Sequence, residues 1–147
     1  GLSNHLLELI RLFKLKIYPN KILFSGQKGI GKSTLAYHFI NYVLTENEDL
    51  EYNLQNLEIN NENSSFKTII NQSNTNLTII DVNPEKKTID INQIRDLIVN
   101  LNKSSFNTKP RFVLIDNIEL LNINSINALL KILEEPNDNI FFILNIH

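Results

Sequence analysis

With 147 residues and 42% hydrophobic content, the chain is about the size of one domain and has enough apolar side chains for a core. A formal net charge of −2 argues against binding nucleic acid through bulk positive charge, and the lack of cysteine argues against disulfides, zinc modules and thiol nucleophiles. The longest apolar run, residues 140–144, is short and no signal-peptide pattern is present, so we expect a cytoplasmic protein without a membrane partner.

The first third of the sequence predicts a helix, a short strand and a second helix. The first helix should cover residues 4–15 with Ser3 or Asn4 as its cap. Its apolar face carries Leu6, Leu7, Ile10 and Phe13. A strand at residues 21–25 leads into a glycine-rich turn. The second helix should run over residues 32–44 and bury Leu35, Ala36, Phe39, Ile40 and Val43.

The middle of the sequence alternates between polar and apolar stretches. Residues 46–76 show no clear hydrophobic period, so we expect a partly helical excursion with loops there. Residues 76–82 predict a second strand, which Asn83 and Pro84 end. A third helix should occupy residues 91–102, where apolar side chains recur at helical spacing: Ile91, Ile94, Ile98 and Leu101.

The last part of the sequence predicts two strands with a helix between them. Residues 111–116 are mostly apolar, as expected of a strand covered on both faces. A helix over residues 125–135, ended by Pro136, should bury Ile126, Leu129, Leu130 and Leu133. Residues 140–145 predict a fourth strand. This alternation predicts one α/β domain over residues 1–147 with a mostly parallel sheet.

The turn after the first strand has the glycine, lysine and serine spacing of a complete P-loop, from Gly26 to Ser33. In such a loop, backbone N–H groups cradle phosphate oxygens, the lysine meets the β- and γ-phosphate charge, and the hydroxyl ligates Mg²⁺. The alternative is an ordinary strand-to-helix turn with a solvated lysine, but such a turn has no need of Lys32 and Ser33 after its last glycine. We therefore predict that ATP or ADP with Mg²⁺ binds at Gly26, Gln27, Lys28, Gly29, Ile30, Gly31, Lys32, Ser33 and Thr34.

Asp116 ends the third predicted strand and is the candidate Walker B carboxylate, which would hold Mg²⁺ together with Ser33 and act as the catalytic residue. The alternative is an aspartate that caps a turn. Position 117 is asparagine, whose amide can orient water but cannot usefully take its proton, and Glu119 should lie too far along the loop to replace it. The sequence therefore predicts nucleotide binding with weak hydrolysis or none.

Three segments resemble those of bacterial DNA polymerase III clamp-loader subunits. Residues 127–136 read NALLKILEEP after the Asp116 strand, and residues 26–37 and 91–95 are most similar to the delta-prime subunits of that family. The resemblance implies an AAA+ three-layer P-loop NTPase fold and a hetero-pentamer that opens the sliding clamp and places it on primed DNA. It also implies an arginine finger supplied by a neighbour, a stator-like subunit with little hydrolysis, and a sensor-1 position near residues 145–147.

The sequence departs from that family in three ways. It lacks the four-cysteine zinc module, the Ser-Arg-Cys segment that carries the finger would lie beyond His147, and the family's fifth strand beside the P-loop strand is missing. We therefore expect a fold truncated before its last strand, with no zinc. Two other functions stay open: a hydrolysing gamma/tau-like subunit, and a structural module whose P-loop holds no nucleotide.

Overall fold

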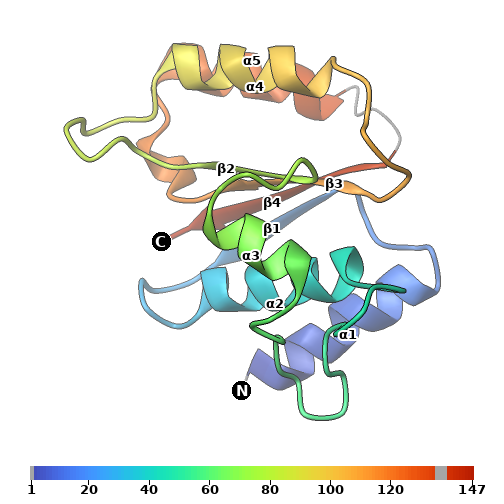
Figure 1. The fold of residues 1–147 in the computed structure, drawn as a ribbon. Helices are drawn as coiled ribbons and strands as arrows, with labels where there is room; N and C mark the ends of the chain where they lie inside the picture. The colour runs from blue at the N-terminus through green and yellow to red at the C-terminus, as the bar shows by residue number, and fades with distance from the viewer. Residues whose placement is uncertain (1, 135–138) are drawn as a thin grey trace.

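A four-stranded parallel sheet lies between two layers of helices (Figure 1). The computed structural model describes residues 2–134 and 139–147. The strands stand in the order β1-β4-β3-β2, with bounds Lys21–Ser25 (β1), Ile140–Ile146 (β4), Arg111–Ile115 (β3) and Leu77–Ile80 (β2). On one face lie α1 (Leu2–Lys14), α2 (Lys32–Leu44) and α3 (Ser64–Ile70), and on the other lie α4 (Ile91–Leu101) and α5 (Ile123–Glu134). The predicted α/β fold with a parallel sheet is confirmed.

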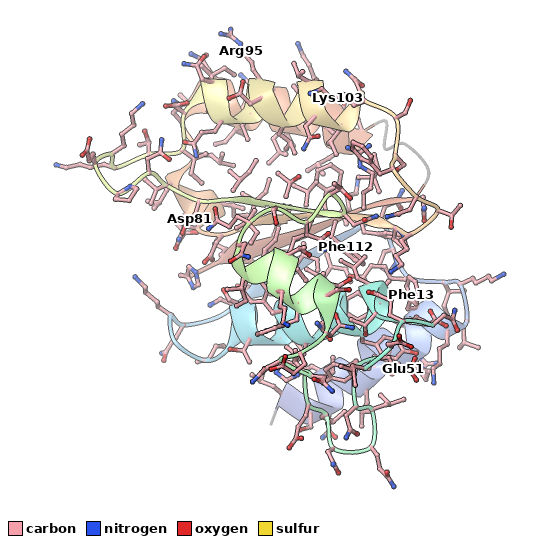
Figure 2. All side chains as sticks on the ribbon, in the orientation of Figure 1. Phe13, Glu51, Asp81, Arg95, Lys103 and Phe112 are labelled. Atoms are coloured by element: carbon pink, nitrogen blue, oxygen red, sulfur yellow. The ribbon has the colours of Figure 1, made fainter. Side chains whose placement is uncertain are left out.

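The alternating side chains of β3 explain why the sheet needs both helical layers. Phe112 and Leu114 are buried with the α1 and α2 side chains, whereas Val113 and Ile115 are buried with those of α4 and α5. Figure 2 shows Phe112 between the sheet and α2, where its ring meets Phe39 edge-on at a centroid distance of 6.0 Å. A strand buried on both faces reads as a continuous apolar run.

The first helix differs from its prediction at its start and on its apolar face. α1 begins at Leu2, so Ser3 and Asn4 lie inside the helix and neither is its cap. Leu7 is 46% exposed, because the helix turns Leu6, Leu9 and Ile10 toward the core instead. In α2, all five side chains predicted to be buried are buried.

The last helix also differs from its prediction. α5 begins at Ile123, two positions earlier than predicted, because the Asn122 side chain accepts a hydrogen bond from the Ser125 N–H at 2.8 Å and caps the helix. Ile126 and Leu130 are exposed, at 39% and 48%, so the prediction that these two side chains are buried is wrong. The predicted end at Glu135 and Pro136 lies outside the described residues.

The remaining strand and helix boundaries are close to those predicted. β2 is shorter at both ends than the predicted 76–82, because the Asn76 side chain bonds to Asn107 and because Asp81 accepts a hydrogen bond from the next backbone N–H. α4 and β3 each end one residue early, and β4 ends one residue late. A capping box of Asp90 and Gln93 starts α4.

The polar excursion at residues 46–76 is partly helical, as predicted, and a hydrogen bond between His38 Nδ1 of α2 and the Tyr52 hydroxyl at 2.8 Å holds it against that helix. Its α3 is capped by Asn63, which accepts from the Phe66 N–H at 3.0 Å. The Glu48 carboxylate accepts hydrogen bonds from Ser65 Oγ at 2.7 Å and from Lys109 Nζ at 3.1 Å. The bond from Lys109 ties the excursion to the loop before β3.

Within the described ranges, no helix combines the length and apolar character that crossing a bilayer needs.

Candidate nucleotide site

The P-loop joins β1 to α2 and needs glycine at two positions. Gly29 (φ 87°) and Gly31 (φ 98°) both lie in the left-handed region, which other residues rarely adopt. A Cβ at Gly31 would also overlap Leu2 Cδ1, the end of a flexible side chain, whereas a Cβ at Gly29 would meet nothing within 4 Å. Gly31 is therefore the tighter position, because α1 packs directly on the start of α2.

Lys32 is folded back into the loop and is only 5% exposed. Its Nζ donates to the Gly26 carbonyl and, at 2.9 Å, to the Gln27 carbonyl. An ammonium carries three N–H donors, so one is left beyond these two bonds. Because Lys32 is also the first residue of α2, its charge adds to the partial positive charge at the start of that helix.

Ser33, Asp116 and Asn145 meet at the carboxyl ends of the strands. Ser33 Oγ donates to Asp116 Oδ2 at 3.5 Å and accepts from Asn145 Nδ2 at 3.4 Å. Asn145 is fully buried, and its Oδ1 has no hydrogen-bond partner within the described part of the chain. The Ser33 hydroxyl and the Asp116 carboxylate are two neighbouring oxygen donors, which suits Mg²⁺ shared with phosphates.

Two further groups contact the Asp116 carboxylate. His147 Nε2 lies 2.8 Å from Asp116 Oδ1, and the Asn117 N–H donates to the same oxygen at 3.0 Å. Glu119 is in the short 3₁₀ helix at Ile118–Leu120, where its carboxylate accepts from the His147 N–H at 3.4 Å. Asn145 and His147 thus lie beside the P-loop serine and Asp116.

A second carboxylate at this edge is not among the predicted site residues. Asp81 follows β2, and its Oδ1 accepts from Asn117 Nδ2 at 2.8 Å; Figure 2 shows Asp81 at the edge of the sheet. The pKa of Tyr37 on α2 is raised mainly by burial and then by the charges of Asp116 and Asp81, so both carboxylates act on that face. The sequence gives no signal for it, because Asp81 falls inside the predicted strand 76–82 and the order of the strands is known only from the structure.

Comparison with known proteins decides the family. A sequence profile described as DNA polymerase III, delta subunit, matches residues 3–147. The chain belongs to the DNA polymerase III delta subunit family. The resemblance seen in residues 26–37, 91–95 and 127–136 is thereby confirmed at the level of the family.

Relatives of this family member include several DNA polymerase III subunits. Subunit tau of Bacillus subtilis (strain 168) is 34% identical over 129 residues, which are 88% of this chain and 21% of that protein. The delta-prime subunit of Buchnera aphidicola subsp. Baizongia pistaciae is 28% identical, over 90% of this chain and 41% of its own length. The delta-prime subunit of Pseudomonas aeruginosa PAO1 is 26% identical, with coverages of 88% and 38%. The chain thus spans less than half of the length of each of these relatives.

Two solved structures share the fold. A gamma subunit-related protein from Thermotoga maritima superposes with a TM-score of 0.61 at 19% identity, over 95% of this chain and 39% of that one. PCH-2 from Caenorhabditis elegans superposes with a TM-score of 0.50 at 20% identity, over 99% and 36%. At these identities the likeness concerns the fold alone.

The predicted site residues of this delta-family chain form one continuous segment plus Asp116. Gln27, Lys28, Ile30 and Thr34 are exposed, Lys32 is buried, and Ser33 and Asp116 are half-buried. Within residues 2–134 and 139–147, no group of three or more His, Cys, Asp or Glu side chains could hold a metal ion unaided. Ser33 and Asp116 fit Mg²⁺ only as partners of phosphate oxygens, which is the usual way that Mg²⁺ is bound.

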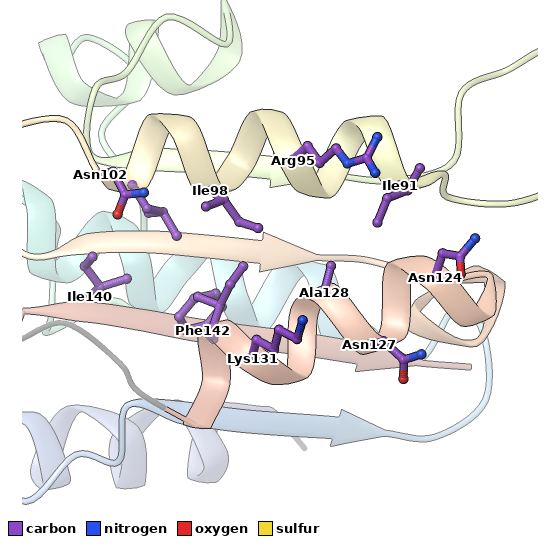
Figure 3. A pocket seen from close by; sticks show the side chains of 12 residues that line it. Ile91, Arg95, Ile98, Asn102, Asn124, Asn127, Ala128, Lys131, Ile140 and Phe142 are labelled. Atoms are coloured by element: carbon purple, nitrogen blue, oxygen red, sulfur yellow. The ribbon is translucent and has the colours of Figure 1, made fainter.

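A cavity lies on the face of the sheet that α4 and α5 cover. It measures about 780 Å³ and lies between the sheet and the helices α4 and α5, with an apolar lining that includes Ile98 of α4 and Phe142 of β4 (Figure 3). Arg95 and Lys131 project from the two helices at its sides. These two residues belong to the segments 91–95 and 127–136 that carry the family resemblance, so both segments meet at this cavity and not at the P-loop.

Proposed function

We propose that residues 1–147 are the AAA+ nucleotide-binding module of a delta-prime-like clamp-loader subunit. The module binds ATP or ADP with Mg²⁺ at the P-loop and hydrolyses it weakly or not at all. Its partners are the other clamp-loader subunits of a cytoplasmic hetero-pentamer, the sliding clamp, and primed DNA reached through the assembled complex. Family membership supports the replication role, and the P-loop geometry supports the ligand.

The observation that carries this proposal is the convergence of Lys32, Ser33 and Asp116. A buried ammonium, a hydroxyl and a carboxylate come from two elements and meet at one edge of the sheet. Lys32 would exchange its contacts with the Gly26 and Gln27 carbonyls for phosphate oxygens, which attract an ammonium more strongly than neutral carbonyls do. Mg²⁺, when bound, would neutralise phosphate charge between Ser33 and Asp116.

Asn117 supports the expectation of slow hydrolysis. The residue follows Asp116 directly, in a left-handed conformation with φ 55° and ψ 50°. Its amide orients a water molecule but cannot accept the proton that the water must lose. Glu119 is engaged with the His147 N–H, so we assign it no role as a base.

One comparison favours a second candidate, a hydrolysing gamma/tau-like subunit. Subunit tau of Bacillus subtilis is 34% identical to the chain, whereas the delta-prime relatives of Buchnera and Pseudomonas are 28% and 26% identical. The family profile, which is that of the delta subunit, and Asn117 support the delta-prime-like interpretation instead. Hydrolysis in the assembled complex separates the two candidates.

The test is a reconstitution of the full-length protein with its partner subunits, sliding clamp and primed DNA. The parent and Lys32→Ala proteins are compared for ATP turnover and for clamp loading, with the exposed and distant Lys103→Ala as the matched control. The proposal expects that the parent binds nucleotide. It also expects that the complex with Lys32→Ala turns over ATP as fast as the complex with the parent. Turnover that Lys32→Ala abolishes would support the gamma/tau-like candidate. Absence of nucleotide binding, with clamp loading unchanged in Lys32→Ala, would contradict both.

A further inference from the structure

The cavity between the sheet and the helices α4 and α5 has an apolar floor and apolar walls. Its floor comes from the sheet, where Ile140 and Phe142 of β4 are only 5% and 1% exposed. Its walls include half-buried side chains of the two helices, Ile98 of α4 and Ala128 of α5. The volume of about 780 Å³ falls within the range of cavities that bind small organic ligands.

One face of each helix lines the cavity. The lining positions recur at intervals of three and four residues, as expected of a single helix face: Ile91, Arg95 and Ile98 on α4, and Asn124, Ala128 and Lys131 on α5. Ala128 has the smallest of these side chains, and its methyl group leaves open the space that a larger apolar residue would fill. The cavity therefore depends on a small side chain at position 128.

The rim of the cavity carries positive charge, although the formal net charge of the chain is −2. Arg95 and Lys131 are both exposed, and Figure 3 shows them on the two helices at the sides of the cavity. The other polar side chains that line it are neutral amides: Asn102, Asn124 and Asn127. None of the described residues that line the cavity is acidic. An anion at this rim would therefore meet two cations and several amide donors, with no like charge among the lining residues.

We propose that this cavity binds a small amphipathic anion, whose apolar body covers the floor and whose acidic group stays at the rim with Arg95 and Lys131. The acidic group remains partly in water, because both cations are exposed, so the complex buries no unpaired charge. Burial of the apolar body supplies most of the affinity, and the two cations favour an acidic ligand over a neutral one. The cavity shares no lining residue with the P-loop, so this inference goes beyond the proposed function and does not rest on nucleotide binding.

The apolar floor distinguishes this ligand from inorganic phosphate and from a nucleic-acid backbone. Either of these could contact Arg95 and Lys131, but neither has an apolar group that would cover Ile140 and Phe142. A ligand that contacts both the rim and the floor needs a ring system or a hydrocarbon chain as well as its acidic group.

Fluorescence titration of the full-length protein with 1-anilinonaphthalene-8-sulfonate, an apolar ring system with one sulfonate, tests for the site. We expect saturable binding by the folded parent. Ala128→Leu fills the cavity, so it should weaken binding at least about tenfold while it preserves or raises the melting temperature. Asn92→Leu, at an exposed position of α4 outside the cavity, is the matched control. Ile98→Phe fills the cavity from α4 and provides a second variant in case Ala128→Leu does not fold.

Two results of this titration would overturn the proposal. One is a folded parent that shows no saturable binding. The other is a folded cavity-filling variant that binds the probe as tightly as the parent does.

Single substitutions of the two cations test the role of the rim. Arg95→Gln and Lys131→Gln should each weaken probe binding by about threefold or more, the size of effect expected for a partly exposed ion pair. Lys103→Gln removes an exposed cation that does not line the cavity, so its binding should match that of the parent. An equal loss in all three variants would show that the probe responds to net charge alone, which contradicts a specific role for the rim.

Competition experiments test the class of ligand. The compounds 2-naphthoate and 2-naphthalenemethanol share a ring system but differ in charge, and the acid should displace the probe at a concentration at least about threefold lower. Equal displacement by the two compounds would refute the preference for an anion. Displacement by inorganic phosphate or a single-stranded oligonucleotide, without displacement by 2-naphthoate, would identify the rim as a phosphate-binding surface and would refute the amphipathic ligand.

Discussion

Ser33 Oγ lies 3.5 Å from Asp116 Oδ2, although 83 residues separate them in the chain. The strand order brings them together, because β4 alone stands between the P-loop strand β1 and the Asp116 strand β3. All strands are parallel, so their carboxyl ends share one edge, which is where ligands gather in open α/β sheets. This distance is the geometric basis for assigning both residues to one magnesium ion.

Asp116→Asn should remove the dependence of nucleotide binding on Mg²⁺. The amide keeps the shape of the side chain but loses the charge that attracts the cation, so affinity in Mg²⁺ should fall about tenfold or more, toward the affinity measured with a chelator. Calorimetric titration with and without Mg²⁺ measures the effect. Glu119→Gln, a carboxylate at the same edge, is the control. Equal enhancement by Mg²⁺ in Asp116→Asn and the parent would rule out the assignment.

Gly31→Ala should be slightly more damaging than Gly29→Ala. Both positions have positive φ, so each alanine costs about 1 kcal/mol or more in backbone strain. Only at Gly31 does the new methyl group also meet Leu2 Cδ1, the end of a flexible side chain that can turn aside, which adds less than about 1 kcal/mol. Chemical denaturation of the two variants measures the difference. A cost at Gly29 that clearly exceeds the cost at Gly31 would contradict this account of the loop.

Folding stability should fall as the pH rises above about 10. Burial, and then the nearby Glu58 carboxylate, raises the pKa of Tyr52 from 10.0 to about 12. Between these values the folded state keeps a proton that the unfolded state has released, so the contribution of Tyr52 is complete below pH 10 and is lost as the pH approaches 12. Burial also raises the pKa values of Tyr18, Tyr37 and Tyr42.

Tyr52→Phe tests that pH dependence directly. The unfolding free energy of the variant should decline less steeply than that of the parent between pH 10 and pH 12, because one of the four tyrosines has been removed. Denaturant titrations at several pH values in this window provide the two slopes. Parallel slopes for variant and parent would contradict the raised pKa of Tyr52.

Tyr18→Phe should preserve or increase stability. The Tyr18 ring stacks on Phe39 with a centroid distance of 4.9 Å, but its buried hydroxyl has no partner among the described residues. Removing a buried, unpaired hydroxyl while keeping the ring should raise the free energy of unfolding by up to about 1 kcal/mol. Tyr42→Phe, at a half-buried tyrosine, should change it little. A loss of more than about 1 kcal/mol in Tyr18→Phe would reveal a partner for the hydroxyl.

The P-loop and the strand ending in Asp116 could be predicted because their signals are local. The spacing of glycine, lysine and serine predicts the P-loop turn. The apolar run predicts a strand that is covered on both faces. The convergence of Ser33 and Asp116 followed from one further rule, that parallel strands end at a common edge. Composition and periodicity carry no signal for strand order, which is what makes the two residues near neighbours.

The features that could not be predicted from the sequence depend on contacts between segments that are distant in the chain. Ile126 and Leu130 have helical apolar spacing, yet α5 turns Ser125 inward so that its Oγ donates to the Ile89 carbonyl at 3.1 Å. Asp81 falls within a predicted strand, and only its bond to Asn117 marks it as part of the site. Leu7 is exposed because α1 packs through Leu6, Leu9 and Ile10, a choice that depends on α2.

Nucleotide binding at the P-loop is the central claim, and calorimetric titration of ATP with Mg²⁺ into the full-length protein tests it most directly. We predict a dissociation constant of about 1–100 μM for the parent, with affinity at least about tenfold weaker in Lys32→Ala because a charge-assisted contact to phosphate is lost. Lys103→Ala should match the parent. If the folded parent releases no heat with saturating ATP or ADP, and neither nucleotide moves its melting temperature, the account of this site is wrong.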